Sequence, residues 1–290
     1  MILFERGCLH MQNKNPLVQP VLKWAGGKRQ LLSEISKYIP KSIKNYYEPF
    51  IGGGAVLFHL QPKKAIINDF NNELINVYTV IRDNLEELLT DLQKHKNEEE
   101  YFYYTRALDR TPEFNILNKI QKASRILYLN KTCFNGLFRV NSSGEFNTPF
   151  GKYKNPNITN SITLRAVSKY LNENDITFLN GDFETALKGI RKGSFVYFDP
   201  PYHPISDSSN FTGYTLGGFS NEDQERLKKL CDTLTKKGVK FLLSNSASPF
   251  ILDLYKDYKI ELVTATRNIN SDGAKRGEIN EVLVRNYEQD

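Results

Sequence analysis

The sequence places an acid, two prolines and a tyrosine directly after an apolar run. Phe195–Phe198 are apolar or aromatic, and the tetrapeptide Asp-Pro-Pro-Tyr, residues 199–202, follows without a gap. Proline cannot donate a backbone hydrogen bond, and it biases the residue before it to extended geometry. An apolar strand must therefore end here in a rigid corner that holds Asp199 and Tyr202 in fixed relation. The alternative is an ordinary diproline turn after a strand.

Such a corner suits chemistry on an amino group attached to a purine. The lone pair of that nitrogen is delocalised into the ring, which makes it a poor nucleophile. The Asp199 carboxylate and the Pro200 carbonyl can each accept one of its hydrogens, while Tyr202 can stack on the ring. Catalysis would then rest on proximity and on in-line attack at a sulfonium methyl, with no metal needed.

A glycine turn earlier in the chain has the pattern of a ligand loop. Gly52-Gly53-Gly54 follows a predicted strand, Asn45–Tyr47, and precedes a predicted helix, Ala55–Leu60. Glycines at this junction let a ligand approach the backbone near the positive end of a helix dipole. Asp69 ends the next strand, where a carboxylate can bind ribose hydroxyls. A plain tight turn is the alternative, and a dinucleotide fingerprint is incomplete because its third glycine position is Leu57.

The elements that must position these residues alternate between strands and helices. Short apolar runs bounded by turn residues indicate buried parallel strands. An α/β fold with a mostly parallel sheet and helices on both faces is therefore expected. The predicted strands are Asn45–Tyr47, Ala65–Ile67, Ile176–Leu179, Phe195–Phe198 and Lys240–Leu243, with a closing antiparallel pair at Ile260–Ala265 and Glu281–Asn286 and a helix at Glu222–Leu234.

A long stretch interrupts this alternation. Residues 71–153 have a mostly helical pattern, are rich in Tyr, Phe, Lys and Arg, and end in two short arms around a Ser-Gly turn within Phe138–Asn147. That turn predicts a β-hairpin. The expected organisation is a loose arm at 1–16, a catalytic domain at 17–70 and 154–290, and an inserted target-recognition domain at 71–153. A supporting subdomain without a ligand is the alternative for the insertion.

Composition narrows the class of partner. The net charge of +6 favours a polyanion, although many basic proteins bind no nucleic acid. Cys8, Cys133 and Cys231 lack metal-ligand spacing, so reduced thiols and no metal site are expected. No apolar run approaches the roughly 20 residues of a membrane-spanning helix, and no signal peptide is evident. A cytoplasmic protein without membrane association is expected.

The motifs together resemble those of the Dam-type DNA adenine-N6 methyltransferases of bacteria and phages, and within them the methylases that recognise GATC. The resemblance extends from Val21 to Tyr287 in one motif order. The matching motifs are Leu22–Lys28 at the amino terminus, Glu48–Gly54 as cofactor loop, Asn68-Asp69 as ribose-binding acid, Asp199–Tyr202 as catalytic tetrapeptide and Glu281–Tyr287 as terminal strand.

The resemblance implies a Rossmann-like fold and an S-adenosylmethionine pocket without metal. It also implies catalytic roles for Asp199, Pro200 and Tyr202. The cofactor-binding residues that it implies are Trp24, Lys28, Phe50, Gly52, Gly54, Asp69, Asp182, Phe183 and Asp199.

For the substrate, the resemblance implies double-stranded DNA with the target adenine flipped out of the helix. Arg139 would read a guanine in the major groove, Phe134 or Leu137 would wedge into the stack, and Lys152 with Lys154 would hold phosphates. Core packing or a phosphate contact is the alternative for each single residue. The DNA-binding residues so implied are Phe134, Asn135, Leu137, Arg139, Asn147, Pro149 and Lys152.

Other readings stay open on sequence grounds. Methylation of cytosine N4 needs the same acceptors, and a catalytically silent DNA-binding protein could keep the fold. A dinucleotide oxidoreductase would have no use for the Asp-Pro-Pro-Tyr corner. A monomer is expected, with a possible cognate restriction endonuclease that forms no stable complex with it.

Overall fold

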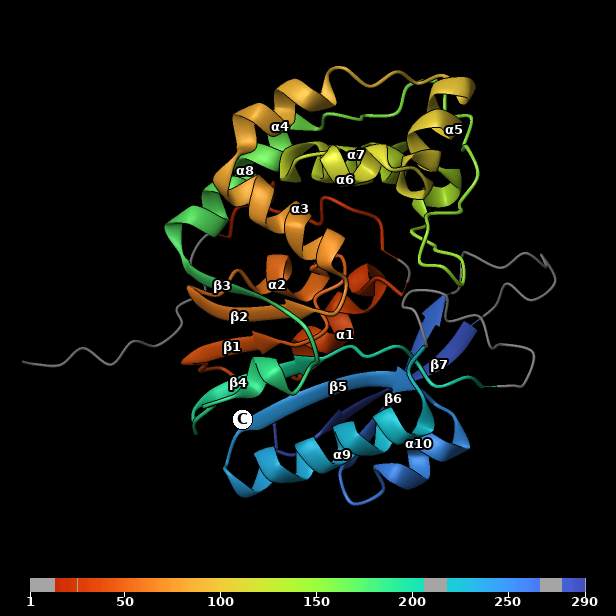
Figure 1. Ribbon diagram of the computed structural model, residues 1–290. Helices are drawn as coiled ribbons and strands as arrows, with labels where there is room; N and C mark the ends of the chain where they lie inside the picture. Colours follow the sequence, from red (N-terminus) through yellow and green to blue (C-terminus); the bar gives the residue numbers. More distant parts are fainter. Residues whose placement is uncertain (1–13, 25, 206–217, 267–277, 290) are drawn as a thin grey trace, which may run out of the picture.

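The computed structural model describes residues 14–24, 26–205, 218–266 and 278–289. It consists of a central sheet between a large helical layer and a smaller one (Figure 1). Most of the expected amino-terminal arm, together with Cys8, lies outside the described residues.

The sheet has seven strands in the order β3-β2-β1-β4-β5-β7-β6. β1 to β5 run parallel to their neighbours, and β7 runs antiparallel to both β5 and β6. This confirms the predicted mostly parallel sheet with its closing antiparallel pair. The strands are β1 Asn45–Glu48, β2 Lys64–Asp69, β3 Asp175–Asn180, β4 Ser194–Phe198, β5 Lys240–Ser246, β6 Lys259–Thr266 and β7 Glu278–Arg285.

Alternating side chains of the strands form two hydrophobic cores, one on each face of the sheet. In β4, Phe195 and Tyr197 belong to the core under the large helical layer, whereas Val196 and Phe198 belong to the core under the smaller one. Successive strand residues point to opposite faces, so a strand buried on both sides must be apolar throughout. This is the reason that the apolar run Phe195–Phe198 could be predicted as a strand; the observed strand begins one residue earlier, at Ser194.

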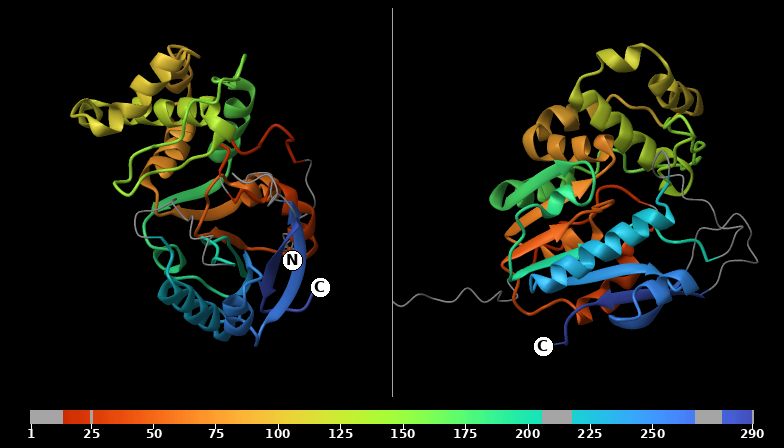
Figure 2. Two further views of the ribbon diagram at one scale, coloured as in Figure 1. Left: turned by 90° about the vertical axis from the view of Figure 1, so that its right-hand side faces the viewer. Right: turned by 60° about the horizontal axis from the view of Figure 1, so that its bottom comes forward.

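Among the described residues, helices α3 to α8 lie on one side of the sheet and form the large layer, while α9 and α10 lie on the other side and form the smaller one (Figures 1 and 2). Helix α7 lies at the centre of the large layer, is buried around most of its circumference and contacts α3, α4 and α5. A helix apolar on most sides belongs inside a layer. The large layer comprises α3 Asn72–Asp83, α4 Leu85–Leu92, α5 Glu99–Ala107, α6 Glu113–Ile116, α7 Lys119–Thr132 and α8 Ser161–Glu173; the smaller comprises α9 Asn221–Lys236 and α10 Pro249–Leu254.

Shorter elements connect these layers to the sheet. The predicted helix α2, Ala55–Leu60, follows the glycine turn. An isolated antiparallel bridge joins Val140 to Phe146, and Asn147 N–H donates to Arg139 O at 3.0 Å, so the expected hairpin is present as a short one. The remaining elements are α1 Leu32–Lys37 and the 3-10 turns η1 Lys28–Leu31, η2 Leu108–Arg110, η3 Phe134–Gly136 and η4 Thr185–Leu187.

The strand order contains a switch point. The chain goes from β1 to β2 and β3 on one side, and then returns to place β4 on the other side of β1. The connections after β1 and β4 therefore diverge at the carboxyl ends of the two strands. Open α/β sheets bind their ligands at such a point.

Candidate active site

Three carboxyl groups lie at the carboxyl ends of adjacent strands around the switch point. Asp69 ends β2, Glu48 ends β1 and Asp199 follows β4, and these strands are neighbours in the sheet. The glycine turn and the Asp-Pro-Pro-Tyr corner thus meet at one edge of the sheet, although 145 residues separate Gly54 from Asp199.

Lys28 lies between Asp199 and Tyr202. Its Nζ is 2.8 Å from Asp199 Oδ1, 4.5 Å from the centroid of the Tyr202 ring and 2.6 Å from Gly26 O. Lys28 is buried, because only 4% of it is exposed. An ammonium group therefore rests on an aromatic face and donates to a carboxylate beside it, an arrangement that combines a cation–π contact with a charge-assisted hydrogen bond.

The ionisation of Asp199 is set by opposing effects. Burial raises the pKa of its carboxyl from 3.8 to about 6; the charge and hydrogen bond of Lys28 oppose that rise, and the negative charge of Glu281 adds to it. Desolvation disfavours the charged form, and a nearby cation restores it. Asp199 is therefore mainly a carboxylate at neutral pH, and it becomes protonated in mildly acidic solution.

The corner after β4 is held on several sides. Tyr202 donates its phenol hydrogen to Glu281 Oε2 on β7 at 2.6 Å, and Gln224 Nε2 donates to Pro201 O at 3.0 Å. Asn245 Oδ1 accepts His203 N–H at 3.1 Å. Pro200 is buried inside this corner. These contacts fix the plane of the Tyr202 ring beside Asp199.

The glycine turn is bound to the acid of the next strand. Gly52 N–H donates to Asp69 Oδ2 at 3.0 Å, and Tyr78 donates its hydroxyl hydrogen to Gly52 O at 2.7 Å. Gly54 has φ of +70°, and a Cβ added there would lie 2.7 Å from Phe58 Cε2. Only glycine fits that position without strain or displacement. A Cβ on Gly52 would lie 3.0 Å from Trp24 Cδ1, so the turn packs closely on the indole.

Aromatic rings border the same edge of the sheet beyond the turn. Phe50 and Phe183 stack with their centroids 5.3 Å apart. Asp182 Oδ2 lies 3.0 Å from Arg226 Nη2, and Asp182 Oδ1 accepts Glu184 N–H at 2.9 Å. The structure thus brings Phe50 and Phe183 together, while the Asp182 carboxylate is bonded to Arg226 and to its own loop.

The residues expected to read DNA come together in two paired segments. Phe134 N–H donates to Pro149 O at 2.8 Å, and Arg139 Nε donates to Asn147 Oδ1 at 2.7 Å. Residues 137–149 are called the recognition hairpin below. Phe134, Asn135, Pro149 and Lys152 are exposed, and Leu137, Arg139 and Asn147 are partly exposed.

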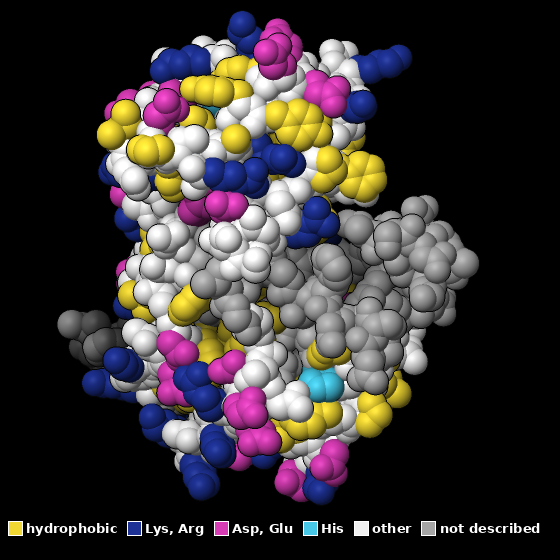
Figure 3. All heavy atoms as spheres, turned by 45° about the vertical axis from the view of Figure 1, so that its right-hand side comes forward, with side chains coloured by type: hydrophobic (Ala, Val, Ile, Leu, Met, Phe, Trp, Pro, Cys, Tyr) yellow, Lys and Arg dark blue, Asp and Glu magenta, His cyan; other side chains and the backbone are white. Residues whose placement is uncertain are grey.

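Trp24 joins the recognition hairpin to the glycine turn. Its indole stacks on Phe138 with centroids 4.6 Å apart and an interplanar angle of 20°, and its side chain lies close to Gly52 and Gly53, where an added Cβ would come within 3.0 and 3.1 Å of it. On the face in Figure 3, Lys and Arg side chains and hydrophobic rings are interspersed over the helical layer. Such a surface suits phosphates and bases better than a uniformly acidic or apolar one.

Two charged residues of the site were not predicted individually. Glu48 is 2% exposed, accepts a hydrogen bond from Tyr46 at 2.7 Å, and has a pKa raised far above 4.5 by burial. Glu281 binds Tyr202 from a strand 79 positions away. Glu48 could have been found from its place at a strand end beside Asp69, whereas only the fold brings Glu281 to the corner.

Two further observations concern groups that the described part of the chain does not contain. Within residues 14–24, 26–205, 218–266 and 278–289, no three His, Cys, Asp or Glu side chains are grouped as a metal site requires. None of the helices in those ranges is long and apolar enough to span a membrane.

Comparison with known proteins identifies the family. Residues 24–269 match the model of the D12 class N6 adenine-specific DNA methyltransferases. The chain is 46% identical to the type II methyltransferase M1.LlaDCHI of Lactococcus lactis subsp. cremoris, over 96% of this chain and 99% of that protein. It is 43% identical to the type II methyltransferase M.MjaIII of Methanocaldococcus jannaschii (93% and 99% covered) and 33% identical to the DNA adenine methylase of Salmonella typhi (91% and 93% covered). This chain belongs to the D12 class of N6 adenine-specific DNA methyltransferases.

Proposed function

We propose that this methyltransferase transfers the methyl group of S-adenosylmethionine to N6 of an adenine that is flipped out of double-stranded DNA, within the sequence GATC. Asp199, Pro200 and Tyr202 are the proposed catalytic residues. A monomer that acts without a stably bound endonuclease is proposed as the working form.

The position of Lys28 carries this proposal. Its ammonium nitrogen donates to Asp199 while lying over the Tyr202 ring. A nitrogen with hydrogens to donate is therefore already accommodated at this corner. An adenine amino group that replaces it would donate to Asp199 Oδ1 and to the Pro200 carbonyl, with its ring against Tyr202. Lys28 must release at least part of its bond to Asp199 when the base enters.

The chemical step follows from these contacts. The N6 lone pair forms a bond to the methyl carbon as the carbon–sulfur bond of the sulfonium breaks, and the sulfur keeps the electron pair of that bond. N6 then carries a positive charge and loses one hydrogen as a proton, which Asp199 can accept and pass to solvent. Most of the rate enhancement comes from alignment of the nitrogen, the methyl carbon and the sulfur.

The described residues fit an adenosyl cofactor at the switch point. Asp69 uses one lone pair of each oxygen for Gly52 N–H and Asn71 N–H, so each oxygen retains a lone pair for a ribose hydroxyl. The glycine turn brings its backbone to the carboxyl end of β1, and Phe50 with Phe183 offers an apolar wall for a purine. Trp24, Lys28 and Asp182 are proposed to complete the pocket.

The depth of the corner supports the proposed base flipping. Pro200 is buried and Asp199 is only 22% exposed at its side chain, so an adenine inside a duplex cannot reach them. Residues 71–153 are proposed as the target-recognition domain, residues 17–70 and 154–290 as the catalytic domain. Arg139 is proposed to bind a guanine of GATC, Phe134 or Leu137 to fill the gap in the stack, and Lys152 to bind a phosphate.

The substitution Asp199→Ala tests the proposed role of the corner. We expect methyl transfer to fall below detection while circular dichroism shows a folded protein. Tritiated-methyl transfer by the unmodified protein, followed by nucleoside analysis and by sequencing of methylated positions, tests the product and the site. N4-methylcytosine as product, turnover by the Asp199→Ala variant, or methylation outside GATC would each contradict the corresponding part of the proposal.

A further inference from the structure

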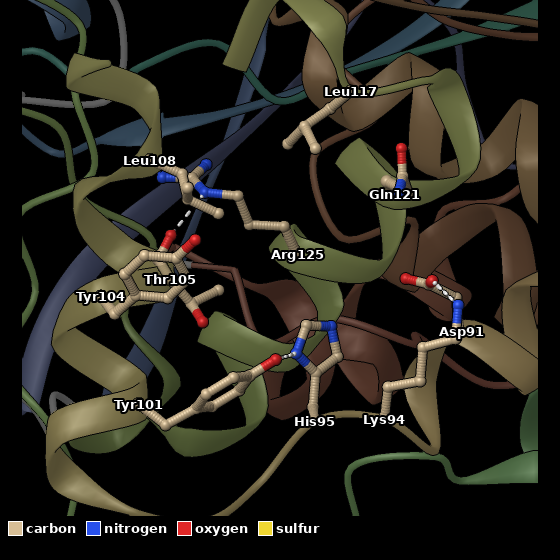
Figure 4. A pocket seen from close by; sticks show the side chains of 10 residues that line it. All are labelled: Asp91, Lys94, His95, Tyr101, Tyr104, Thr105, Leu108, Leu117, Gln121 and Arg125. Carbon is tan, nitrogen blue, oxygen red and sulfur yellow. Dashed lines mark hydrogen bonds and ion pairs between the residues drawn. The ribbon is translucent and has the colours of Figure 1, made fainter. Parts of the chain in front are cut away.

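The buried side chain of Arg125 binds the carboxyl end of helix α5, near the recognition hairpin. Arg125 on α7 is 1% exposed, and its Nε donates to Thr105 O at 2.9 Å (Figure 4). Its Nη2 donates to Arg106 O at 2.7 Å. These carbonyls belong to the last turn of α5, where the helix itself leaves carbonyl oxygens unpaired. Arg125 therefore fixes the position at which α5 ends and η2 begins.

Asp109 in η2 is the acidic partner of this arginine. Its Oδ2 lies 2.8 Å from Arg125 Nη2, and its side chain is 11% exposed. A buried guanidinium needs such a partner, because an unpaired charge in the interior is costly. A cavity of about 170 Å³ lies beside the Arg125 side chain, between α4, α5 and α7 (Figure 4).

The same carboxylate oxygen binds the recognition hairpin. Asp109 Oδ2 accepts Phe146 N–H at 2.8 Å, and the next residue, Arg110, donates from Nη2 to Phe146 O at 2.8 Å. Both backbone groups of Phe146 are thus bound by consecutive residues of η2. This contact sets where the second arm of the hairpin lies along the helical layer.

Phe146 is linked to the orientation of the Arg139 guanidinium through the next residue, Asn147. Asn147 follows Phe146, and its Oδ1 accepts Arg139 Nε at 2.7 Å while its carbonyl accepts Arg139 Nη2 at 3.3 Å. The planar guanidinium of Arg139 is therefore oriented by the residue next to the one that Asp109 binds. A bidentate contact with a base requires a fixed guanidinium plane.

We propose that Asp109, held by Arg125, is a positioning residue for sequence recognition: it fixes the register of the recognition hairpin and thereby aims the Arg139 guanidinium at its base. This inference rests on the proposed function of Arg139. Asp109 contacts neither DNA nor cofactor in this role.

The test compares two substitutions of Asp109. Asp109→Ala removes the acceptor for Phe146 N–H, whereas Asp109→Asn keeps an acceptor oxygen and removes only the charge. The measurement is the ratio of kcat/KM between a duplex with the methylated sequence and duplexes with one base pair changed, at a temperature where circular dichroism shows every variant folded. We expect Asp109→Ala to lower this ratio by about 10-fold or more, within the range that one bidentate base contact provides.

Asp109→Asn should restore most of the discrimination. Both variants should unfold at a lower temperature than the parent protein, because Arg125 loses the nearer of two acidic partners and keeps only Glu73, whose Oε1 lies 3.8 Å from Arg125 Nη1. S-adenosylmethionine affinity should not change in either. Asp91→Ala is the matched control, since Asp91 is an acid of the same helical layer that pairs with Lys94 at 2.8 Å. Its discrimination ratio should equal that of the parent.

Two results separate this inference from the function on which it rests. If Asp109→Ala lowers the unfolding temperature but keeps the parent ratio, while Arg139→Ala loses discrimination, the positioning role is wrong and the proposed reading by Arg139 stands. If Arg139→Ala keeps the parent ratio, Arg139 does not read the base, and both the proposed function of Arg139 and the inference about Asp109 fail.

Discussion

The charge of Asp199 depends on two neighbours of opposite sign. Burial raises the pKa of this carboxyl to about 6; Lys28 opposes that rise, and Glu281 adds to it. Because the carboxylate form must accept a hydrogen from the substrate amine, kcat/KM should fall as the pH decreases through about 6. The side chains at positions 28 and 281 therefore determine the acidic limb of the activity profile.

Replacing each neighbour should move this limb in opposite directions. Lys28→Met removes the cation that favours the carboxylate, so the midpoint of the kcat/KM profile should rise. Glu281→Gln removes the negative charge that disfavours it, so the midpoint should fall. The profile is measured by tritiated-methyl transfer across the acidic range, with Glu34→Gln, whose partner is the surface residue Lys37, as control. Two unchanged midpoints would show that Asp199 does not titrate in this limb.

Site residues that are adjacent in the sequence could be predicted as a group, whereas those that only the fold brings together could not. Asp199 and Tyr202 belong to one tetrapeptide, whose proline stiffness is a local property. Glu281 comes from β7 and Lys28 from η1, and neither position has a local pattern that relates it to the corner. The family resemblance supplied Lys28, whereas no sequence argument supplied the ion pair or the hydrogen bond to Glu281.

The glycine turn between β1 and α2 requires two different properties of glycine. Gly54 has a positive φ, and it also lies where a Cβ would contact Phe58 at 2.7 Å. Gly189, by contrast, has φ of +76° and nothing within 4 Å of an added Cβ. A side chain at Gly189 would therefore cause backbone strain only, whereas a side chain at Gly54 would cause both backbone strain and steric crowding.

Alanine at each position measures the difference. Gly189→Ala should lower the free energy of unfolding by about 1–2 kcal/mol, the cost of a left-handed L-residue. Gly54→Ala should lower it further, because Phe58 or Tyr78 must move, and it alone should weaken S-adenosylmethionine binding. Urea unfolding and calorimetry give the two quantities. Parent-like cofactor affinity in Gly54→Ala would place the cofactor away from this turn.

β4 was predictable as an element because burial on both faces makes Phe195–Phe198 apolar, and α2 was predicted with its observed bounds. β5 was predicted to end at Leu243 but continues to Ser246. Its polar residues are buried because they bind other polar groups: Ser244 bonds Tyr197 at 2.7 Å, and Asn245 bonds Gln224 at 3.1 Å. Partners so distant in sequence give a polar strand end no recognisable pattern.

At the scale of the whole molecule, positively charged side chains lie on both helical layers, so the contribution of each to DNA binding depends on where it lies. Lys152 follows the recognition hairpin, 3.7 Å from Glu99 and with its side chain 73% exposed. Lys256 lies beyond α10 on the far layer, paired with Asp253 at 3.1 Å. Both lysines contribute equally to the net charge of +6, whereas a duplex bound at the recognition hairpin would contact Lys152 and not Lys256.

Salt dependence should distinguish these two lysines. Lys152→Ala should weaken binding to all duplexes by a similar factor and reduce the slope of log K against log salt by about 1, since one phosphate contact is lost. Lys256→Ala should leave the slope as it is. Fluorescence anisotropy of a labelled duplex over a salt series gives both slopes. A sequence-dependent loss in Lys152→Ala would instead indicate contact with a base.

The order of the strands was the part of the architecture that the sequence left open. Alternation of strands and helices predicts a parallel sheet, but it does not say that β4 returns to the other side of β1. That return brings the turn after β1 and the corner after β4 to the same edge of the sheet. The two motifs were identified separately, and only the strand order explains why they form one site.

The stack between Trp24 and Phe138 gives this protein a built-in optical probe. Trp24 is the only tryptophan in the chain, and its ring lies between the loop proposed for the cofactor and the hairpin proposed for DNA. When excitation excludes the tyrosines, all emission comes from that one junction. Titration with either ligand should change the intensity or the wavelength of this light. If the first ligand also alters the response to the second, the indole links the two binding events; a signal indifferent to both would mean that the junction stays rigid throughout turnover.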